Sequence, residues 1–288
     1  MADLVAAGGK RIRPALVLLA AKCGSYDLEK LTPAAVAVEL THAATLVHDD
    51  VIDRAEVRRG RPTVAARLGD EPAIVVGDFY FAKAYEQAAL TDSPEVVAIL
   101  ARAVMDICAG EVRQQAIRHH YDTSVDEYMR RIEAKTATLL AACCDIGALL
   151  GGVDDARRAA LRAYGRLLGL AFQIADDVLD YEGSEDEIGK PIGHDITEGF
   201  ATLPLMMALE DGAVAGELHK LVQSQRQLTG AEAQEVVELV RASDGPKRAL
   251  DRARELSSEA RRELESVGAS EATNSLAALT NYVVSRKL

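Results

Sequence analysis

The amino-acid sequence predicts an all-α protein, and three observations support this prediction. Apolar residues recur at three- and four-residue intervals over long stretches, which is the pattern of amphipathic helices. These stretches are rich in alanine, leucine and glutamate, which favour helices. No segment alternates apolar and polar residues convincingly, and no repeat or low-complexity linker interrupts the chain. We therefore expect one domain over residues 1–288, with roughly ten or more helices and the most apolar of them central.

The expected helices are separated by pairs or triplets that contain proline or glycine. Examples are Thr32-Pro33, Ser93-Pro94 and Gly151-Gly152. Thr123-Ser124, followed by two acidic residues, has the composition of a helix start. The expected helices span residues 33–53, 71–90, 94–119, 125–150, 155–182, 229–242 and 246–267, with a last one near 270–286.

Composition narrows the class of protein. The chain has 288 residues, of which 49% are hydrophobic, so it can bury a substantial core. Its net charge of -12 argues against a general nucleic-acid binder, because such proteins need basic surface to neutralise phosphates. Abundant alanine fits close helix packing, and it would also leave room for a long apolar cavity.

The sequence also bears on the cellular compartment. No uninterrupted apolar run reaches the roughly 18 residues of a membrane span. The first seven residues lack the pattern of a signal peptide. Cysteines occur in apolar, helix-like segments and form no Cys-x-x-Cys pair, which predicts a reduced, cytoplasmic protein. They are Cys23, Cys108, Cys143 and Cys144.

Two acidic motifs of the same form, Asp-Asp-x-x-Asp, are the most informative feature. They occupy residues 49–53 and 176–180, and each follows a strongly apolar stretch. Residues four apart lie on nearly the same face of a helix, so the first and last aspartates of each motif are neighbours. Like charges at this spacing destabilise a helix, and burial adds to the cost of each carboxylate. The motifs therefore need a compensating cation.

Mg²⁺ fits these ligands. It prefers oxygen ligands in an octahedron and usually takes one or two carboxylates, with waters and substrate phosphates completing its shell. A single motif of this kind would fit a solvated helix face equally well. Two copies in apolar surroundings favour metal binding. The candidate ligands are Asp49, Asp50, Asp53, Asp176, Asp177 and Asp180.

In these motifs the chain resembles the trans-isoprenyl diphosphate synthase family, of the medium- or long-chain type. The resemblance runs from Gly8 to Pro204 and, more weakly, to the C-terminus. It implies an isoprenoid-synthase-type bundle in which both motifs face a deep central apolar cavity and hold three Mg²⁺ ions against an allylic diphosphate. It further implies that Asp49, Asp53 and Asp176 are direct ligands, and that the other three aspartates bind directly or through water.

Basic and polar residues complete the resemblance. The segment Gly8-Gly9-Lys10-Arg11-Ile12-Arg13-Pro14 could be an exposed basic loop, and His42 could be a core histidine. Glycines beside arginine and lysine also suit the binding of an anion. The resemblance assigns isopentenyl diphosphate to Lys10, Arg13, His42 and Arg59. It assigns the allylic diphosphate to Arg58, Lys135, Thr136, Gln173 and Lys190.

The implied reaction is ionisation, condensation and elimination. Mg²⁺, held by residues such as Asp49 and Asp176, acts with Lys135 and Arg58 to stabilise charge on the leaving diphosphate. The allylic substrate would be geranyl, farnesyl or geranylgeranyl diphosphate. Isopentenyl diphosphate attacks the allylic cation, and a proton is then lost to the released diphosphate. The resemblance thus predicts a magnesium-dependent prenyltransferase of isoprenoid biosynthesis that forms a homodimer.

Residues before the first motif predict the length of the product. Ala44 and Thr45 stand five and four residues before Asp49, where family members with short products often carry bulky aromatic residues. Small residues there, with Thr41 and Ala37 further along the same face, leave the cavity open. We therefore expect a hexaprenyl- to octaprenyl-like product. Geranylgeranyl diphosphate is the alternative, because a helix bearing residues 79–81 could close the cavity.

The sequence departs from the family pattern at two places. Many members carry Gly-Lys shortly before Thr-Leu-Pro, whereas this chain has Gly199-Phe200-Ala201, so a cation near the diphosphate is missing. Gly8 comes early, and the helix that commonly precedes this motif is expected to be short or truncated.

Two other functions are possible. A diphosphate-ionising terpene cyclase typically lacks the second acidic motif and the Gly-Gly-Lys-Arg segment. A non-catalytic subunit of a heteromeric synthase is favoured by Phe200 and the short front, but the two intact acidic motifs argue against it.

Overall fold

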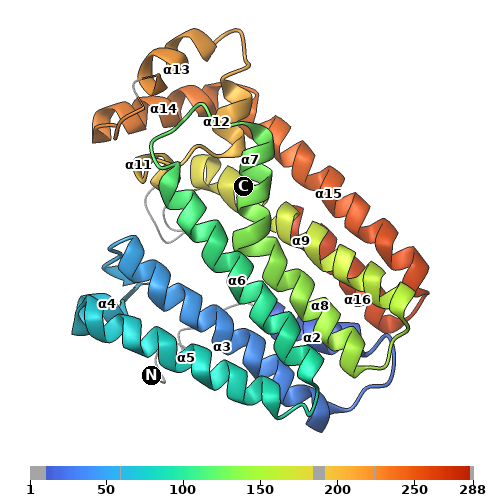
Figure 1. The fold of residues 1–288 in the computed structure, drawn as a ribbon. Coiled ribbons are helices and arrows are strands. Elements are labelled where there is room, and N and C mark those ends of the chain that lie inside the picture. The colour runs from blue at the N-terminus through green and yellow to red at the C-terminus, as the bar shows by residue number, and fades with distance from the viewer. Residues whose placement is uncertain (1–10, 59, 184–191, 224, 286–288) are drawn as a thin grey trace. The chain divides into compact units, whose positions relative to one another are not determined.

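The computed structural model describes residues 11–58, 60–183, 192–223 and 225–285, and it is almost entirely helical (Figure 1). This confirms the all-α prediction. The elements are, in chain order, α2 (Ile12–Ala21), α3 (Leu28–Ile52), β1 (Val57–Arg58), β2 (Arg61–Pro62), α4 (Val64–Leu68), α5 (Asp70–Ala89), α6 (Pro94–Ala116), α7 (Val125–Ile132), the π-helical turn η1 (Glu133–Ala137), α8 (Thr138–Leu150), α9 (Asp155–Glu182), α11 (His194–Thr197), α12 (Leu203–Ala208), α13 (Ala215–Val222), α14 (Gly230–Ala242), α15 (Gly245–Val267) and α16 (Glu271–Val284).

The chain divides into two compact units. The first comprises Met1–Met105, Leu139–Gly165 and Glu263–Leu276, and the second comprises Asp106–Thr138, Arg166–Arg262 and Ala277–Leu288. Each unit is described by itself below. The first acidic motif belongs to the first unit and the second motif belongs to the second unit.

In the first unit, α3 is the long helix that carries the first motif at its C-terminal end. It packs against α2, α4 and α5 (Figure 1). Asp27 caps its start, because the side chain accepts hydrogen bonds from the backbone N–H groups of Glu29 and Lys30. The helix therefore begins before Pro33, and the prediction that it starts at Pro33 was wrong. Pro33 is the sixth residue of the helix, so it removes the N–H that would donate to the Glu29 carbonyl, and the helix continues through it.

Small residues let α5 approach α3 closely. A Cβ at Gly77 would lie 2.2 Å from the Nε2 atom of His48. Ala44, Val47, Ala73 and Tyr80 form a buried apolar cluster on the same interface. This packing fixes the end of α3, and with it the position of the first motif within the unit.

A two-residue antiparallel strand pair follows α3. Val57 pairs with Pro62 and Arg58 with Arg61. Gly60 has a φ of 72°, which suits glycine in the tight turn between the strands. No strand was predicted here, because two residues are too few for an alternating pattern.

The predicted continuous helix 125–150 is interrupted. It divides into α7, η1 and α8, and the π-helical turn contains Lys135 and Thr136. Such turns hold one extra residue and occur frequently at functional sites. Glycine 169 lets α9 approach this turn, since a Cβ at Gly169 would lie 2.5 Å from the Cα atom of Ala137.

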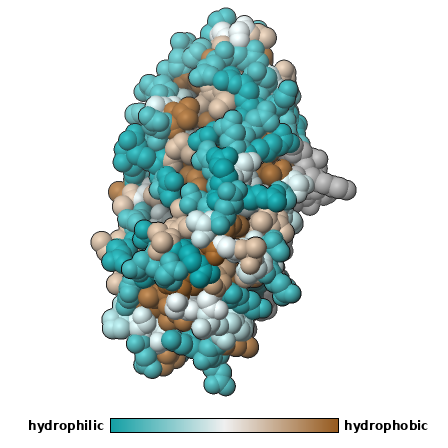
Figure 2. All heavy atoms as spheres, turned by 90° about the vertical axis from the view of Figure 1, so that its right-hand side faces the viewer, coloured by the Kyte–Doolittle hydropathy of each residue, from teal (hydrophilic) through white to brown (hydrophobic). Residues whose placement is uncertain are grey.

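Three short helices of the second unit contact α14. Helices α11, α12 and α13 each pack against it, and α12 also contacts α7. Within the described residues, no helix is both long enough and apolar enough to cross a membrane. Figure 2 shows one face of the molecule, on which hydrophilic side chains predominate and hydrophobic ones form small patches between them.

The close approach at Gly169 leads to a stability prediction. Gly169→Ala should lower the free energy of unfolding by about 1–3 kcal/mol, because the added methyl group meets backbone atoms that cannot move aside easily. Urea unfolding followed by circular dichroism measures the change.

A matched control is Gly216→Ala in α13, where an added Cβ meets no atom within 4 Å. This change should leave stability equal or slightly higher, as alanine favours helices. Equal effects of the two substitutions would contradict the packing argument.

Candidate active site

The first acidic motif contains two half-buried carboxylates and one buried carboxylate. Asp49 and Asp53 are half-buried, and the backbone N–H of Asp53 donates to the Asp49 carbonyl at 2.8 Å, which places them one helical turn apart. Asp50 is fully buried. The helix geometry therefore gives the three aspartates two different environments.

Arg58 neutralises the buried member of this motif. Its Nε atom donates to Asp50 Oδ1 at 2.6 Å. Burial raises the pKa of Asp50, and the charge and hydrogen bond of Arg58 oppose that rise. The other oxygen, Oδ2, is buried and makes no hydrogen bond to any part of the chain that the structure describes. Arg58 thus has a protein partner beside the residues predicted to hold metal.

The loop after α3 brings Arg58 to this position. The N–H of Ala55 donates to the Asp50 carbonyl at 2.9 Å, and the Thr63 hydroxyl donates to the Ala55 carbonyl at 2.7 Å. These bonds fold the strand pair back onto the end of α3. The arginine is therefore held by the turn and not only by its ion pair.

Other predicted residues of the first unit lie on α2 and α3. Arg13 and His42 are half-buried on these two packed helices. Arg11, which was not predicted to bind substrate, forms an ion pair with Glu39. His48 lies against α5, with its Nε2 atom 3.1 Å from the Ile74 carbonyl oxygen and its ring 5.7 Å from that of Phe81.

The residues predicted to set product length differ in burial. Ala44 and Thr41 are fully buried, and Ala44 contributes to the apolar cluster with Tyr80. Thr45 is half-buried, and its hydroxyl donates to the His42 carbonyl at 2.9 Å. Ala44 is therefore the residue at which added volume would meet α5 within the unit.

In the second motif, Asp177 is buried within a hydrogen-bond network. The Tyr128 hydroxyl donates to its Oδ2 at 2.7 Å, and Gln173 Nε2 donates to its Oδ1 at 2.8 Å. The Thr136 hydroxyl in turn donates to Gln173 Oε1 at 2.7 Å. Thr136 and Gln173, both predicted to bind the allylic diphosphate, are thus brought together beside the motif.

Burial has the largest effect on the pKa of Asp177. It raises the pKa of this carboxyl to about 7, and the charge of Asp195 adds to the rise. The hydrogen bonds from Tyr128 and Gln173 and the charge of Arg131 lower the pKa and so offset part of it. Burial and the neighbouring Asp177 also raise the pKa of Tyr128, which therefore acts as a hydrogen-bond donor.

The other two aspartates of the second motif differ in burial. Asp180 is fully buried, and its Oδ2 accepts a hydrogen bond from the backbone N–H of Asp195 at 3.0 Å. The N–H of Gly193 donates to the Asp180 carbonyl at 2.8 Å. Asp176 is half-buried. Asp49, Asp53 and Asp176 are therefore the less buried members of the two motifs.

Lys135 lies in the π-helical turn and pairs with an acid. Its Nζ atom is 2.8 Å from Glu111 Oε2. Its side chain is about one-third exposed. The ammonium group therefore lies next to a carboxylate and is partly accessible to solvent.

The structure identifies three residues that the sequence analysis missed. Tyr128 and Arg131 interact with Asp177 of the second motif, and Glu111 pairs with Lys135. A tyrosine or arginine in an amphipathic helix carries no sequence signal of its contacts. Lys10, Arg59 and Lys190, which were predicted to bind the diphosphates, lie outside the described residues.

The acidic residues suit a divalent metal ion whose remaining ligands come from water and substrate. Within the described ranges, no three histidine, cysteine or acidic side chains converge as a ready-made metal cluster. Asp49 and Asp53 are instead a pair of oxygen donors one turn apart. Such a pair is compatible with Mg²⁺, which usually takes one or two carboxylates in proteins and completes its shell with water and phosphate oxygens.

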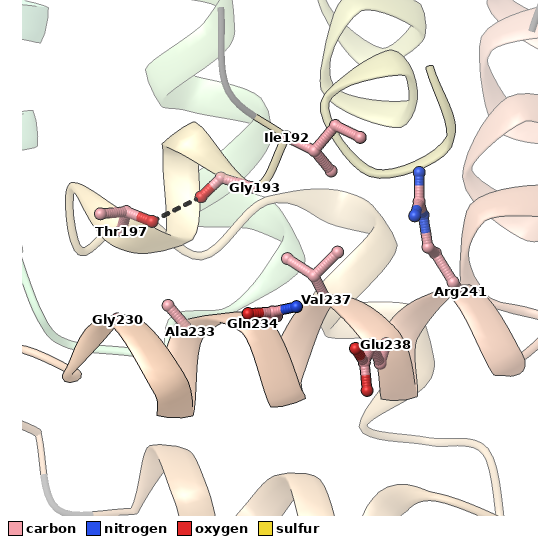
Figure 3. Close-up of a pocket in the computed structure, with 9 residues that line it drawn as sticks. All are labelled: Ile192, Gly193, Thr197, Gly230, Ala233, Gln234, Val237, Glu238 and Arg241. Atoms are coloured by element: carbon pink, nitrogen blue, oxygen red, sulfur yellow. Dashed lines mark hydrogen bonds between the residues drawn. The ribbon is translucent and has the colours of Figure 1, made fainter. Parts of the chain in front are cut away.

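A separate cavity of about 370 Å³ lies in the second unit (Figure 3). It is lined by residues 192, 193 and 197 and by α14, and Val237 points toward Gly193. At its edge Arg241 donates to the carbonyls of Tyr181 and Gly183, just after the second motif. The cavity therefore borders the C-terminal end of α9, and its residues are not those predicted to bind substrate.

The raised pKa of Asp177 leads to a pH prediction. An unfolded aspartate has a pKa of about 3.9, so between about pH 4 and pH 7 the folded chain keeps a proton that the unfolded chain releases. The contribution of Asp177 to stability is fully present below about pH 4 and is lost as pH rises through about 7. Asp177→Asn should remove this dependence.

Urea unfolding in EDTA at pH 5.5 and pH 8 tests this prediction. The stability of the wild-type protein relative to Asp177→Asn should be greater at pH 5.5 than at pH 8. Asp92→Asn, on an exposed loop, is the control and should show no such difference. A pH-independent gap between wild type and Asp177→Asn would contradict the assigned shift.

Comparison with known proteins agrees with the resemblance. The family model of polyprenyl synthetases matches residues 1–240. Heptaprenyl diphosphate synthase component 2 of Geobacillus stearothermophilus is 46% identical over 211 residues, which are 73% of this chain and 66% of that protein. The Bacillus subtilis protein of the same name is 37% identical over 284 residues, 99% of this chain and 81% of that one.

A solved structure is similar over nearly the whole chain. It is the polyprenyl synthase of Caulobacter crescentus in complex with calcium and isoprenyl diphosphate, with a TM-score of 0.92 and 40% identity, covering 99% of this chain and 87% of that one. That protein binds a divalent cation together with a diphosphate. The chain belongs to the polyprenyl synthetase family, and with it to the trans-isoprenyl diphosphate synthases.

Proposed function

We propose that the chain condenses isopentenyl diphosphate with an allylic diphosphate to form an all-trans polyprenyl diphosphate of medium or long chain. The observation that carries the proposal is the division within the first motif. Asp50 is neutralised by Arg58 inside the protein, whereas Asp49 and Asp53 form a half-buried pair of oxygen donors. This arrangement suits a metal ion that arrives with its diphosphate.

The metal would be Mg²⁺, in three ions per site, held by Asp49, Asp53 and Asp176. When bound, Mg²⁺ neutralises the diphosphate and favours its departure. Asp50, Asp177 and Asp180 fix the position of the helix ends through the protein hydrogen bonds described above, and their direct or water-mediated binding of metal remains a prediction.

Lys135 would exchange Glu111 for the allylic diphosphate as it binds. Its position in a π-helical turn sets the direction of the ammonium group, and Glu111 orients that group in the free protein. Thr136 and Gln173 lie beside it as hydrogen-bonding groups. Arg58 adds a guanidinium next to the first motif. Such preorganised charges stabilise a leaving diphosphate most strongly.

Isopentenyl diphosphate would be held by Arg13 and His42, together with Lys10 and Arg59 outside the described residues. Arg13 and His42 come from α2 and α3, which pack against each other. The double bond of isopentenyl diphosphate attacks the allylic cation, and the proton lost afterwards is taken by the released diphosphate.

The assembly is proposed to be a cytoplasmic homodimer. Helix α5 exposes large apolar side chains, among them Ile74, Val75 and Phe79. A surface of this kind suits contact with a second copy. Light scattering during size-exclusion chromatography should give twice the mass of one chain, and a mass of one chain would count against the dimer.

A specific observation favours a second candidate. The two heptaprenyl relatives described above are named as component 2, which suggests a subunit that works with another component. The intact acidic motifs make this chain the catalytic member of such a pair. Elongation by the purified chain alone would exclude a strict need for a partner.

The reaction itself is tested by incubating the chain with Mg²⁺, farnesyl diphosphate and labelled isopentenyl diphosphate. Wild-type protein should form elongated product, and EDTA should abolish it. Asp49→Asn should lower kcat by about 10²–10³, the usual cost of removing one preorganised electrostatic group.

Asp92→Asn is the control for this prediction, since Asp92 is exposed and lies between α5 and α6. It should retain wild-type activity. Absence of product with every allylic substrate, with and without cell extract, would refute the proposed reaction.

Chain length is predicted to depend on the residues before the first motif. Thr45→Phe and Ala44→Phe should shorten the product, because a ring would close the space that small residues leave open. Ala44→Phe should also destabilise the fold by about 1–3 kcal/mol, since Ala44 packs in the cluster with Tyr80.

Val36→Phe, at an exposed position of the same helix, is the matched control and should leave product length unchanged. Products are separated by reversed-phase chromatography after removal of the diphosphate. An unaltered length distribution in Thr45→Phe would reject this model of length control.

A further inference from the structure

A buried guanidinium lies beside the second acidic motif and has no part in the reaction as described above. Arg131, on α7, is only 6% exposed. Arginine is almost never buried to this extent unless it is paired. Its Nη2 atom donates to the Ala201 carbonyl at 2.6 Å, and its charge is one of those that lower the pKa of Asp177. A fixed positive charge is therefore directed at the second motif.

Two aromatic rings hold this guanidinium. The Cζ atom of Arg131 lies 5.4 Å from the ring centre of Tyr128 and 5.9 Å from that of Phe200. Aromatic faces attract cations at these distances. Tyr128 also donates its hydroxyl proton to Asp177 at 2.7 Å. Phe200, Arg131, Tyr128 and Asp177 thus form one continuous chain of contacts.

The residue at position 200 is complementary to this arrangement. The ring of Phe200 also lies 5.7 Å from the Cζ atom of Arg118, so two guanidiniums face it. A lysine at this position would bring a third positive charge to the two arginines, whereas an aromatic ring attracts both. The segment is further fixed because the N–H of His119 donates to the Gly199 carbonyl at 2.8 Å.

We propose that Arg131 is a positioning residue that supplies, from α7, the positive charge that position 200 lacks. It orients Tyr128 and, through it, Asp177, and its charge offsets the carboxylates of the second motif when a metal–diphosphate complex binds. The inference rests on the proposed function and adds to it a residue that acts through its neighbours. Phe200 is then the partner of this charge and not a sign of lost activity.

The experiment uses the purified full chain with Mg²⁺ and inorganic pyrophosphate, whose binding is measured by calorimetry without any turnover. Arg131→Met, which keeps the length of the side chain and removes its charge, should weaken binding by about tenfold or more. Arg131→Lys should recover part of the loss. Arg130→Met, at the exposed neighbouring arginine, is the matched control and should bind within about twofold of wild type.

Relocation of the charge gives the sharpest test. Adding Phe200→Lys to Arg131→Met returns a cation to the same neighbourhood and should restore most of the pyrophosphate affinity. In steady-state assays the same variants should change KM for the allylic diphosphate and the Mg²⁺ requirement together. Wild-type affinity in a folded Arg131→Met protein, or no recovery in the double variant, would overturn the proposal.

A stability cycle keeps the inference testable if binding cannot be measured. Phe200→Lys should lower the urea midpoint of the wild-type protein clearly and that of Arg131→Met much less, since the two residues interact. Equal shifts in both backgrounds would overturn the proposal. If Arg131→Met does not fold, Arg131→Lys replaces it in the cycle. The effect of Phe200→Lys on the urea midpoint should then differ less between the two backgrounds, and equal effects would still overturn the proposal.

Failure of the proposed function would look different. Wild-type protein would then show neither product nor Mg²⁺-dependent pyrophosphate binding, whereas the stability cycle would still report on Arg131 and Phe200. A normal wild-type enzyme with an unaffected Arg131→Met variant would overturn the inference alone.

Discussion

The cost of placing carboxylates next to one another on a buried helix governs the site. Each Asp-Asp-x-x-Asp motif puts at least one acid where water cannot reach it, so the protein must provide partners. In the first motif the partner is a single cation, Arg58, on Asp50. In the second, Asp177 has two neutral donors and a charge at longer range. The less buried acids are then left in position to bind metal with substrate.

The two motifs share the pattern Asp-Asp-x-x-Asp, but their buried aspartates have different partners. Sequence spacing predicted correctly that the first and last aspartates of a motif share a helix face. It could not predict which acid is neutralised by the protein, because Arg58 comes from a strand pair and Tyr128 from another helix. Those contacts depend on turns and packing, which residue spacing along one helix does not encode.

The long helices were predictable for a related reason. Residues 155–182 and 229–242 have a strong helical period, and the observed bounds agree with the prediction to within one residue. Helix α3 begins before the predicted start, because Asp27 caps it there and the helix continues through Pro33. The π-helical turn was missed, since an extra residue in a helical turn leaves the apolar period nearly unchanged. The roles of Lys10, Arg59 and Lys190 rest on the sequence resemblance.

The π-helical turn also constrains how related chains can differ in length. Because η1 holds one residue more than an α-helical turn, loss of a single residue between 132 and 135 would restore the α-helix without breaking the chain. The faces of α7 and α8 would stay nearly the same, because the wider turn takes up its extra residue locally. Only the side chains within the turn, Lys135 and Thr136 among them, would change direction. A one-residue gap in this segment would therefore redirect Lys135 and Thr136 while leaving the helices on either side in place.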